Sequence, residues 1–167
     1  MSIGLLFACN QNNVLSSNVG DDSYISDSKS IEEDLNQSMV VCYSATNNTQ
    51  RVANIIASYI SASTFPLEPV NLYTREDLNY NDSSRRGSKE HNDSNRHVES
   101  MPNTIENFQN YKYVFIGYPI WWGEASWVID DFVIKNDFTD KTIILFATAA
   151  SSPLISSTKK MEEKLKQ

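Results

Sequence analysis

The chain has 167 residues, of which 40% are hydrophobic and 11% aromatic, a composition typical of one globular domain with a sizeable core and a tail. Its formal net charge is −7, most of it in residues 1–38, and the Arg85-Arg86 pair has no aromatic residues around it, which argues against nucleic-acid binding. No apolar segment of the sequence reaches the length needed to span a bilayer.

The first residues of the chain resemble a targeting segment. Residues 1–9 are similar to the end of a bacterial lipoprotein signal, in which a short apolar stretch precedes a lipidated cysteine, here Cys9. Residues 10–37 are rich in Ser, Asn and Asp and predict a disordered polar tether before a domain over residues 38–167. These features predict a lipid-anchored protein of the cell envelope. The alternative is an ordinary disordered N-terminus on a cytoplasmic protein.

A strand predicted over Ser38–Tyr43 leads through a hydroxyl-rich loop into a helix predicted over Thr49–Ser61. Backbone N–H groups, hydroxyls and the positive end of a helix can converge there on one phosphate. The loop lacks both the Gly-Lys pair of triphosphate loops and the three glycines of dinucleotide loops, so the ligand is expected to end in a single phosphate. A capped helix start is the structural alternative. The residues expected to hold the phosphate are Ser44, Thr46, Asn47, Asn48 and Thr49.

The next predicted strand, Pro66–Leu72, is followed by a long polar connection from Tyr73 to Tyr111, with a helix expected around Asp82–Asn92. His91 and His97 lie in this connection, but their spacing matches no zinc pattern, so no metal site is predicted.

A continuous apolar run over Val114–Gly117 predicts a buried strand that ends in a loop with two adjacent tryptophans. Neighbouring side chains on a strand point to opposite faces, whereas on a loop one of the two rings can face a ligand. A hydrophobic plug over the end of the sheet is the alternative. The helix predicted over Ala125–Ile134 carries Trp127 into the core.

A fourth strand over Thr142–Ala147 and a helix over Ser156–Lys166 complete the predicted elements. Strands that alternate with helices predict the α/β fold class, a three-layer domain with a doubly wound parallel sheet. Ligands bind such sheets beyond the carboxyl ends of the strands, where both loops lie.

Two motifs resemble the flavodoxin-like family over about residues 38–167. Residues 44–49 are similar to its Ser-x-Thr-Gly-Asn-Thr phosphate loop, and residues 117–123 to the Gly-Tyr-Pro-Ile-Trp-Trp-Gly signature of one branch. Asn47 replaces a glycine of the family loop, and asparagine tolerates a left-handed backbone. The resemblance implies flavin mononucleotide (FMN) as the cofactor, with Trp121 or Trp122 stacked on its ring. The residues expected to contact the ring are Pro119, Ile120, Trp121, Trp122 and Gly123.

In this family a third loop offers backbone N–H groups to the pyrimidine edge of the flavin, and here it corresponds to Thr148, Ala149 and Ala150. Alanines in place of glycines make positive φ angles costly. Family members normally continue with a fifth strand and a last helix, so the resemblance implies a C-terminally truncated domain whose fourth strand is an open edge. A dimer, or the apolar segment Ile3–Ala8, would cover that edge.

These residues predict an FMN-binding redox protein that acts in electron transfer, without a catalytic residue of its own. One alternative is a small NAD(P)H-dependent FMN oxidoreductase with a quinone-type acceptor, and another is a surface-anchored binding module that has lost flavin. The expected partner is a redox protein or a small-molecule acceptor.

Overall fold

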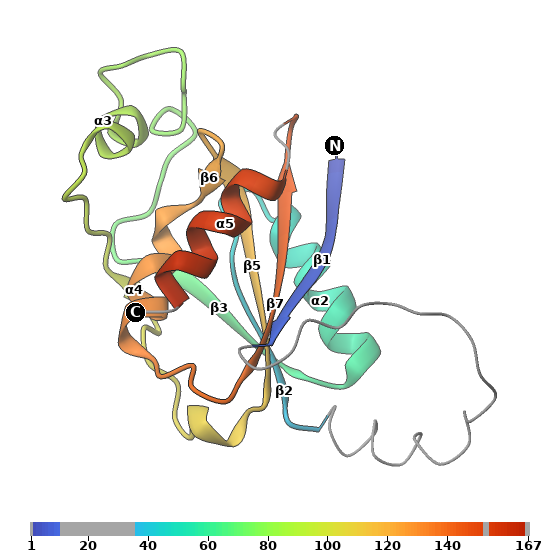
Figure 1. The fold of residues 1–167 in the computed structure, drawn as a ribbon. Helices are drawn as coiled ribbons and strands as arrows, with labels where there is room; N and C mark the ends of the chain where they lie inside the picture. The colour runs from blue at the N-terminus through green and yellow to red at the C-terminus, as the bar shows by residue number, and fades with distance from the viewer. Residues whose placement is uncertain (1, 11–35, 152–153, 166–167) are drawn as a thin grey trace.

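The computed structural model describes residues 2–10, 36–151 and 154–165 (Figure 1). Its centre is a seven-stranded sheet in the order β1-β7-β5-β2-β3-β4, with β6 paired to β5. Strands β7, β5, β2 and β3 are parallel, and β1, β4 and β6 are antiparallel to their neighbours. This mixed, mostly parallel sheet confirms the predicted α/β class. The strands are β1 (Ser2–Asn10), β2 (Ser38–Tyr43), β3 (Ser63–Pro69), β4 (Ser100–Met101), β5 (Tyr113–Trp121), β6 (Glu124–Ala125) and β7 (Thr142–Ala149).

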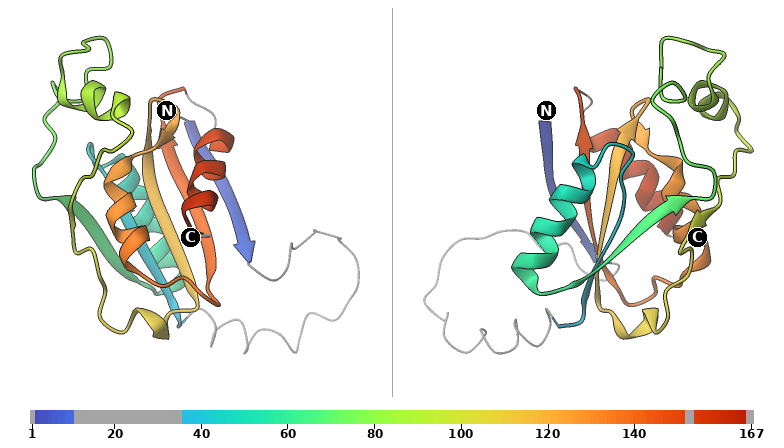
Figure 2. Two further views of the ribbon diagram at one scale, coloured as in Figure 1. Left: turned by 60° about the vertical axis from the view of Figure 1, so that its left-hand side comes forward. Right: turned by 180° about the vertical axis from the view of Figure 1, so that it is seen from behind.

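Helices cover both faces of the sheet, as the rotated views show (Figure 2). Between α2 and the sheet, the side chains of Val40 and Phe146 form a small core with the buried Ala53 of the helix. The opposite face carries the larger core, in which Val41 packs with residues of α4 and α5 such as Met161. Neighbouring valines of β2 thus serve different cores, as the two-residue period of a strand requires. The helices are α2 (Asn48–Ile60), α3 (Arg86–Asn92), η1 (Phe108–Asn110), η2 (Trp127–Ile129), α4 (Asp130–Lys135) and α5 (Leu154–Leu165).

Strand β2 has the predicted bounds, whereas β3 begins three residues before the predicted Pro66. At the end of α2, Ser61 adopts a left-handed φ of 53°, which turns the chain directly into the next strand. Met39 can then pair with Ser63 and Tyr43 with Leu67. The helix end therefore determines where β3 starts.

The outer edge of β7 is paired with β1, so the N-terminal segment covers the edge that was predicted to be open. The antiparallel register places Ser2 opposite Ala149 and Asn10 opposite Thr142, with an irregularity between Gly4 and Phe7. Cys9 lies opposite Ile143 in this strand, and its lipidation stays a prediction, as does the truncation. Most of the predicted tether, residues 11–35, lies outside the described residues. Among the helices that the structure describes, none has the length and apolar character to cross a membrane.

Residues 70–99, which we call the α3 excursion, leave the sheet between β3 and β4 and project beyond the end where β6 lies (Figures 1 and 2). Helix α3 is shorter than the predicted helix because Asp82 instead forms a turn. Its carboxylate accepts hydrogen bonds from the Ser84 backbone N–H at 2.9 Å and from Arg85 Nε at 2.7 Å. The helix therefore begins only at Arg86.

Candidate functional site

The chain leaves β2 at Tyr43 and enters α2 at Asn48, and Asn47 makes the turn between them. Asn47 has a left-handed backbone (φ 60°, ψ 1°), so the residue that replaces the family glycine adopts the conformation expected of it. Among the residues that the structure describes, no side chain caps the start of α2. The N–H groups of its first turn and its positive end are thus left without a side-chain acceptor at the carboxyl end of the sheet.

Ser44 carries a buried polar atom that no protein group satisfies. Its Oγ is shielded from solvent and makes no hydrogen bond to any residue in the described part of the chain. A buried hydroxyl without a partner costs about 1–3 kcal/mol, which a hydrogen bond to a ligand oxygen would recover. Nearby, Thr46 is exposed, and its Oγ1 accepts a hydrogen bond from Asn48 Nδ2 at 3.0 Å. Ser44, Thr46 and Asn48 therefore offer polar groups to an anion at the predicted position.

Thr49, which was also expected to hold the phosphate, is buried in the structure. Its side chain is 1% exposed, and its Oγ1 lies 2.8 Å from Oγ1 of the buried Thr148 at the end of β7. This hydrogen bond joins the first turn of α2 to the third predicted loop. Thr49 and Thr148 therefore hold two parts of the site together, and their hydroxyls are already engaged with each other.

The third loop is less strained than its alanines suggest. Ala149 still belongs to β7, and neither it nor Ala150 has a positive φ. The expected cost of replacing glycines does not arise in this conformation. Ala150 is exposed and lies beside the tryptophan segment, where both line the same pocket.

Pro119, Ile120 and Trp121 lie in strand β5, and not in the predicted loop. β5 continues to Trp121, turns through Trp122 (φ 49°) and Gly123 (φ 79°), and returns as β6. Two successive positive φ angles are typical of a two-residue hairpin turn. Ala125, the predicted start of a helix, pairs instead with Ile120 in this hairpin, and helical structure begins only at η2.

Trp121 is mainly a core residue. It is 9% exposed, and its ring makes edge-on contacts with Tyr43, Tyr73 and Trp127 at centroid distances of 5.4, 5.0 and 5.1 Å. Such edge-to-face pairs are favourable for aromatic rings. For Trp121, the plug alternative describes the packing better than a ring stacked face-on on a ligand.

Trp122 is half-buried and is covered on one side by the α3 excursion. The His91 ring stacks on it at 5.6 Å with an interplanar angle of 17°. A positive φ is unusual for a bulky residue and stores strain, and such strain is common at functional sites. One face of Trp122 is thus occupied by protein, so any ligand reaches its edge or its other face.

Two pockets lie between the loops. One of about 500 Å³ is lined by the hairpin, by Ala150 and Ser151, and by Leu78 and Tyr80 of the excursion. The other, about 840 Å³, shares Leu78 and Tyr80 and extends past Arg75 to Thr46. Both volumes are in the range of cofactor sites. Thr46 of the loop after β2 and the tryptophan hairpin therefore lie at opposite ends of a region. Leu78 and Tyr80 of the excursion form one wall of this region.

This wall was not predicted from the sequence. Leu78 and Tyr80 lie in a polar segment without periodicity, so only the residue types, an apolar side chain and an aromatic ring among Asn and Asp, could have drawn attention to them. Tyr80 is 73% exposed although it lines both pockets, which suits a ring that packs against a planar ligand. Arg75 adds a cation that the loop after β2 lacks, and the neighbouring Glu76 adds a carboxylate to the same pocket.

Glu124, beside the turn, joins three parts of the structure. Its carboxylate pairs with Arg96 of the excursion at 2.9 Å and with Lys160 of α5 at 2.5 Å. Burial alone would raise the pKa of Glu124, but Lys160 and Arg96 together lower it below its usual range. The hairpin therefore carries a carboxylate whose charge is compensated on both sides.

We expect Glu124→Gln to lower the free energy of unfolding by about 1 kcal/mol at neutral pH. A carboxyl group whose pKa is lower in the folded than in the unfolded chain stabilises the fold above the unfolded pKa and loses that contribution as the pH falls through the folded pKa. The difference between wild type and variant in urea denaturation should therefore shrink towards zero in acid. Glu99→Gln, at an exposed position, is the control. A difference that is constant with pH would contradict the ion-pair explanation.

The remaining polar candidates are engaged in packing. His91 stacks on Trp122, and His97 lies 3.9 Å from Asp131, which also pairs with Lys135. Within residues 36–151 and 157–165, no group of three or more His, Cys, Asp or Glu side chains is placed to hold a metal ion. Cys42 is buried, and burial raises the pKa of its thiol to about 12.

Comparison with known proteins identifies the family of the chain. The model of the flavodoxin family matches residues 37–167. A candidate flavoprotein from Bacteroides eggerthii has 32% identity and a TM-score of 0.72, over 75% of this chain and 79% of that chain. One from Bacteroides uniformis has 31% identity and a TM-score of 0.72, over 77% and 81%. Curated proteins gave no match.

A more distant structure, a flavoprotein from Lactobacillus acidophilus in complex with FMN, shares the fold with a TM-score of 0.58 at 16% identity, over 77% of this chain and 85% of that chain. The family model covers most of the chain, and the two Bacteroides proteins have the same fold at about one-third identity. The chain therefore belongs to the flavodoxin family.

Proposed function

We propose that this protein binds FMN and acts as a redox protein in electron transfer. When bound, FMN supplies the electron chemistry, and the protein binds it, orients it and excludes water from it. The observation that carries the proposal is the buried, unpaired hydroxyl of Ser44, next to the left-handed Asn47 and the uncapped start of α2. A terminal phosphate offers the acceptor oxygens and the negative charge that this corner of the molecule can satisfy.

The phosphate would be held by Ser44, Thr46, Asn48 and the first turn of α2. Of these residues, Thr46 lines the pocket that also contains Arg75. Thr49 and Thr148 would keep that turn against the end of β7 through their mutual hydrogen bond. The chain's own residues thus divide into those that bind the anion and those that hold the binding groups in place.

The ring would lie in the pocket of about 500 Å³ that is lined by Trp122, Gly123, Ala150 and Tyr80 among others. Aromatic and apolar side chains there exclude water, which disfavours a charged form of a ring placed among them. The charge of Glu124 is compensated by Arg96 and Lys160, so this carboxylate adds little to that effect. We propose that the pocket walls, more than a local acidic charge, tune the redox potential.

The test is an FMN titration of the full chain and of the Ser44→Ala variant, in which flavin fluorescence reports binding. The variant should raise the dissociation constant about tenfold or more, because a hydrogen bond to a charged group contributes about 1.5–3 kcal/mol. It should leave the FMN-free protein equally stable or more stable, since the removed hydroxyl has no partner there.

Ser38→Ala is the matched control, because Ser38 also carries a buried hydroxyl without a partner in the described region, at the opposite end of β2. Its affinity for FMN should equal that of the wild type. Equal affinities for Ser44→Ala and wild type would remove Ser44 from the phosphate site. A folded wild-type chain that takes up no FMN would refute the proposed function itself.

The same loaded samples separate an electron carrier from an NAD(P)H oxidoreductase. A carrier should keep its flavin absorption when NADPH is added without a partner protein. Rapid bleaching of that absorption would instead assign the oxidoreductase activity to this chain.

A further inference from the structure

All three tryptophans of the chain lie in one cluster beside the pocket, together with Tyr73. Trp121 and Trp122 line the pocket, and both contact Trp127 behind it, at centroid distances of 5.1 and 5.6 Å. Trp127 in turn donates a hydrogen bond from Nε1 to the Tyr73 hydroxyl at 3.1 Å. Each oxidisable ring thus contacts the next, from the pocket to Tyr73.

The far end of this cluster has a proton acceptor. Glu90 of α3 accepts a hydrogen bond on Oε2 from the Tyr73 hydroxyl at 2.5 Å and another from Trp127 Nε1 at 2.8 Å. Its other oxygen, Oε1, accepts from Arg86 Nε at 2.7 Å. The carboxylate is therefore held where it can receive the phenolic proton.

Two guanidinium groups determine how such rings can lose an electron. Arg86 lies over the Tyr73 ring at 3.9 Å, and Arg96 lies over the Trp127 ring at 4.7 Å. A nearby positive charge disfavours a radical cation on either ring. Oxidation at Tyr73 must therefore be accompanied by loss of its proton, and Glu90 is in contact with that proton.

We propose that Trp121, Trp122, Trp127 and Tyr73 form a path that carries an oxidising equivalent out of the pocket and ends in proton transfer to Glu90. The oxidant is an oxygen-centred radical in the pocket, which accepts one electron and becomes an anion. The electron comes from a pocket tryptophan and is replaced from Tyr73, either directly across the Trp121–Tyr73 contact of 5.0 Å or through Trp127. The phenolic O–H bond breaks, its proton moves to Glu90 Oε2, and a neutral tyrosyl radical remains, which an external thiol can reduce. This role goes beyond cofactor binding and would protect the pocket from oxidation.

The experiment is pulse radiolysis of the full chain without FMN, with azide radicals as the one-electron oxidant. These radicals attack indoles in preference to phenols, and every indole of this chain lies in the cluster. The indolyl absorption should decay while the tyrosyl absorption rises with the same rate constant, independent of protein concentration. A rate proportional to protein concentration would overturn the path, because the transfer would then be between molecules.

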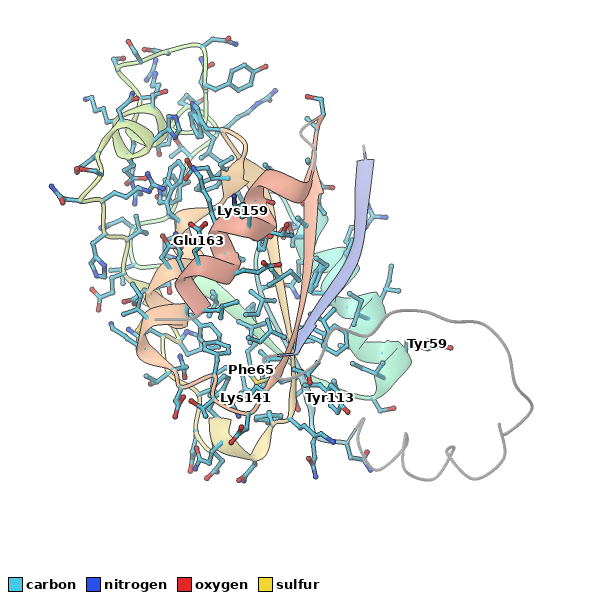
Figure 3. All side chains as sticks on the ribbon, viewed as in Figure 1. Tyr59, Phe65, Tyr113, Lys141, Lys159 and Glu163 are labelled. Carbon is cyan, nitrogen blue, oxygen red and sulfur yellow. The ribbon has the colours of Figure 1, made fainter. Side chains whose placement is uncertain are left out.

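Variants identify the end of the path. Tyr73→Phe should abolish the delayed rise of the tyrosyl signal, and Glu90→Gln should slow it about tenfold or more, since the amide cannot act as the base. Tyr43→Phe is the matched control, because Tyr43 also contacts Trp121 but has no hydrogen-bonded carboxylate in the part of the chain described. Tyr59, 91% exposed and extending from α2 into solvent (Figure 3), provides a second control, Tyr59→Phe, for direct oxidation.

A measurement on the wild type keeps the test independent of variant folding. In D2O the transfer from indole to phenol should slow, because a proton moves with the electron. An unchanged rate in D2O, or a delayed rise that survives in folded Tyr73→Phe, would refute the path. Since FMN is absent throughout, these outcomes do not depend on whether the protein binds FMN.

Discussion

Gly117→Ala is expected to lower the free energy of unfolding by about 2 kcal/mol or more, because a Cβ at this position would overlap the Phe146 ring. The added atom would lie 2.2 Å from Cζ and 2.4 Å from Cε2 of Phe146, far inside contact distance. Gly117 and Phe146 pair across the central strands β5 and β7, and Phe146 is 2% exposed in the core beneath α2. Urea denaturation followed by circular dichroism measures the loss.

A second substitution shows whether the loss arises from this overlap. Phe146→Leu removes the ring atoms that the new Cβ would meet and leaves a cavity of its own. In a double-mutant cycle, Gly117→Ala should therefore cost much less in the Phe146→Leu background than in the wild type. Additive effects of the two substitutions would contradict the steric explanation.

Gly87→Ala is expected to abolish or strongly weaken FMN binding while the sheet stays folded. Its Cβ would lie 2.7 Å from the backbone O of Asp77 and 2.8 Å from Cη2 of Trp122. The backbone N–H of Gly87 donates to the same Asp77 oxygen at 2.9 Å, so the start of α3 is in close contact with the segment that leads to Leu78 and Tyr80. The extra methyl group would push this wall and Trp122 apart, and both line the ring pocket.

The measurement combines an FMN titration with urea denaturation of the same samples. The free energy of unfolding should fall by about 1–3 kcal/mol, which is the usual cost of overpacking a core. Lys89→Ala, at an exposed position of the same helix, should leave both quantities as in the wild type. Wild-type FMN affinity in Gly87→Ala would show that the excursion does not form part of the cofactor site.

The local features of the site could be predicted because they depend on neighbouring residues. Strand β2 has the predicted bounds, since a continuous apolar run followed by Ser, Thr and Asn is both a buried strand and a helix start. The left-handed turn at Asn47 follows from the side chain's tolerance of that backbone. The buried Thr49 could not be predicted as a partner of Thr148, because the two hydroxyls are 99 residues apart in the sequence.

The conformation of the tryptophan segment depends on contacts with distant parts of the chain. Residues 119–121 were predicted to form a loop, but they extend β5, because pairing of Ile120 with Ala125 and of Trp121 with Glu124 stabilises a hairpin. Which ring faces the pocket then depends on neighbours from distant segments, His91 for Trp122 and Tyr43 and Tyr73 for Trp121. None of these contacts has a periodic signal along the chain.

Local sequence patterns predicted the α/β class, the order of the main strands and helices, and the position of the hydroxyl-rich loop at the carboxyl end of the sheet. Hydrophobic periodicity and turn chemistry act over a few residues, so these features are written locally. Tertiary contacts determine that the α3 excursion forms a wall of the pockets, that Trp121 is packed in the core, and that β1 covers the edge of β7. Those outcomes depend on side-chain packing and strand pairing between segments far apart in the chain, where shape and burial decide which contacts form.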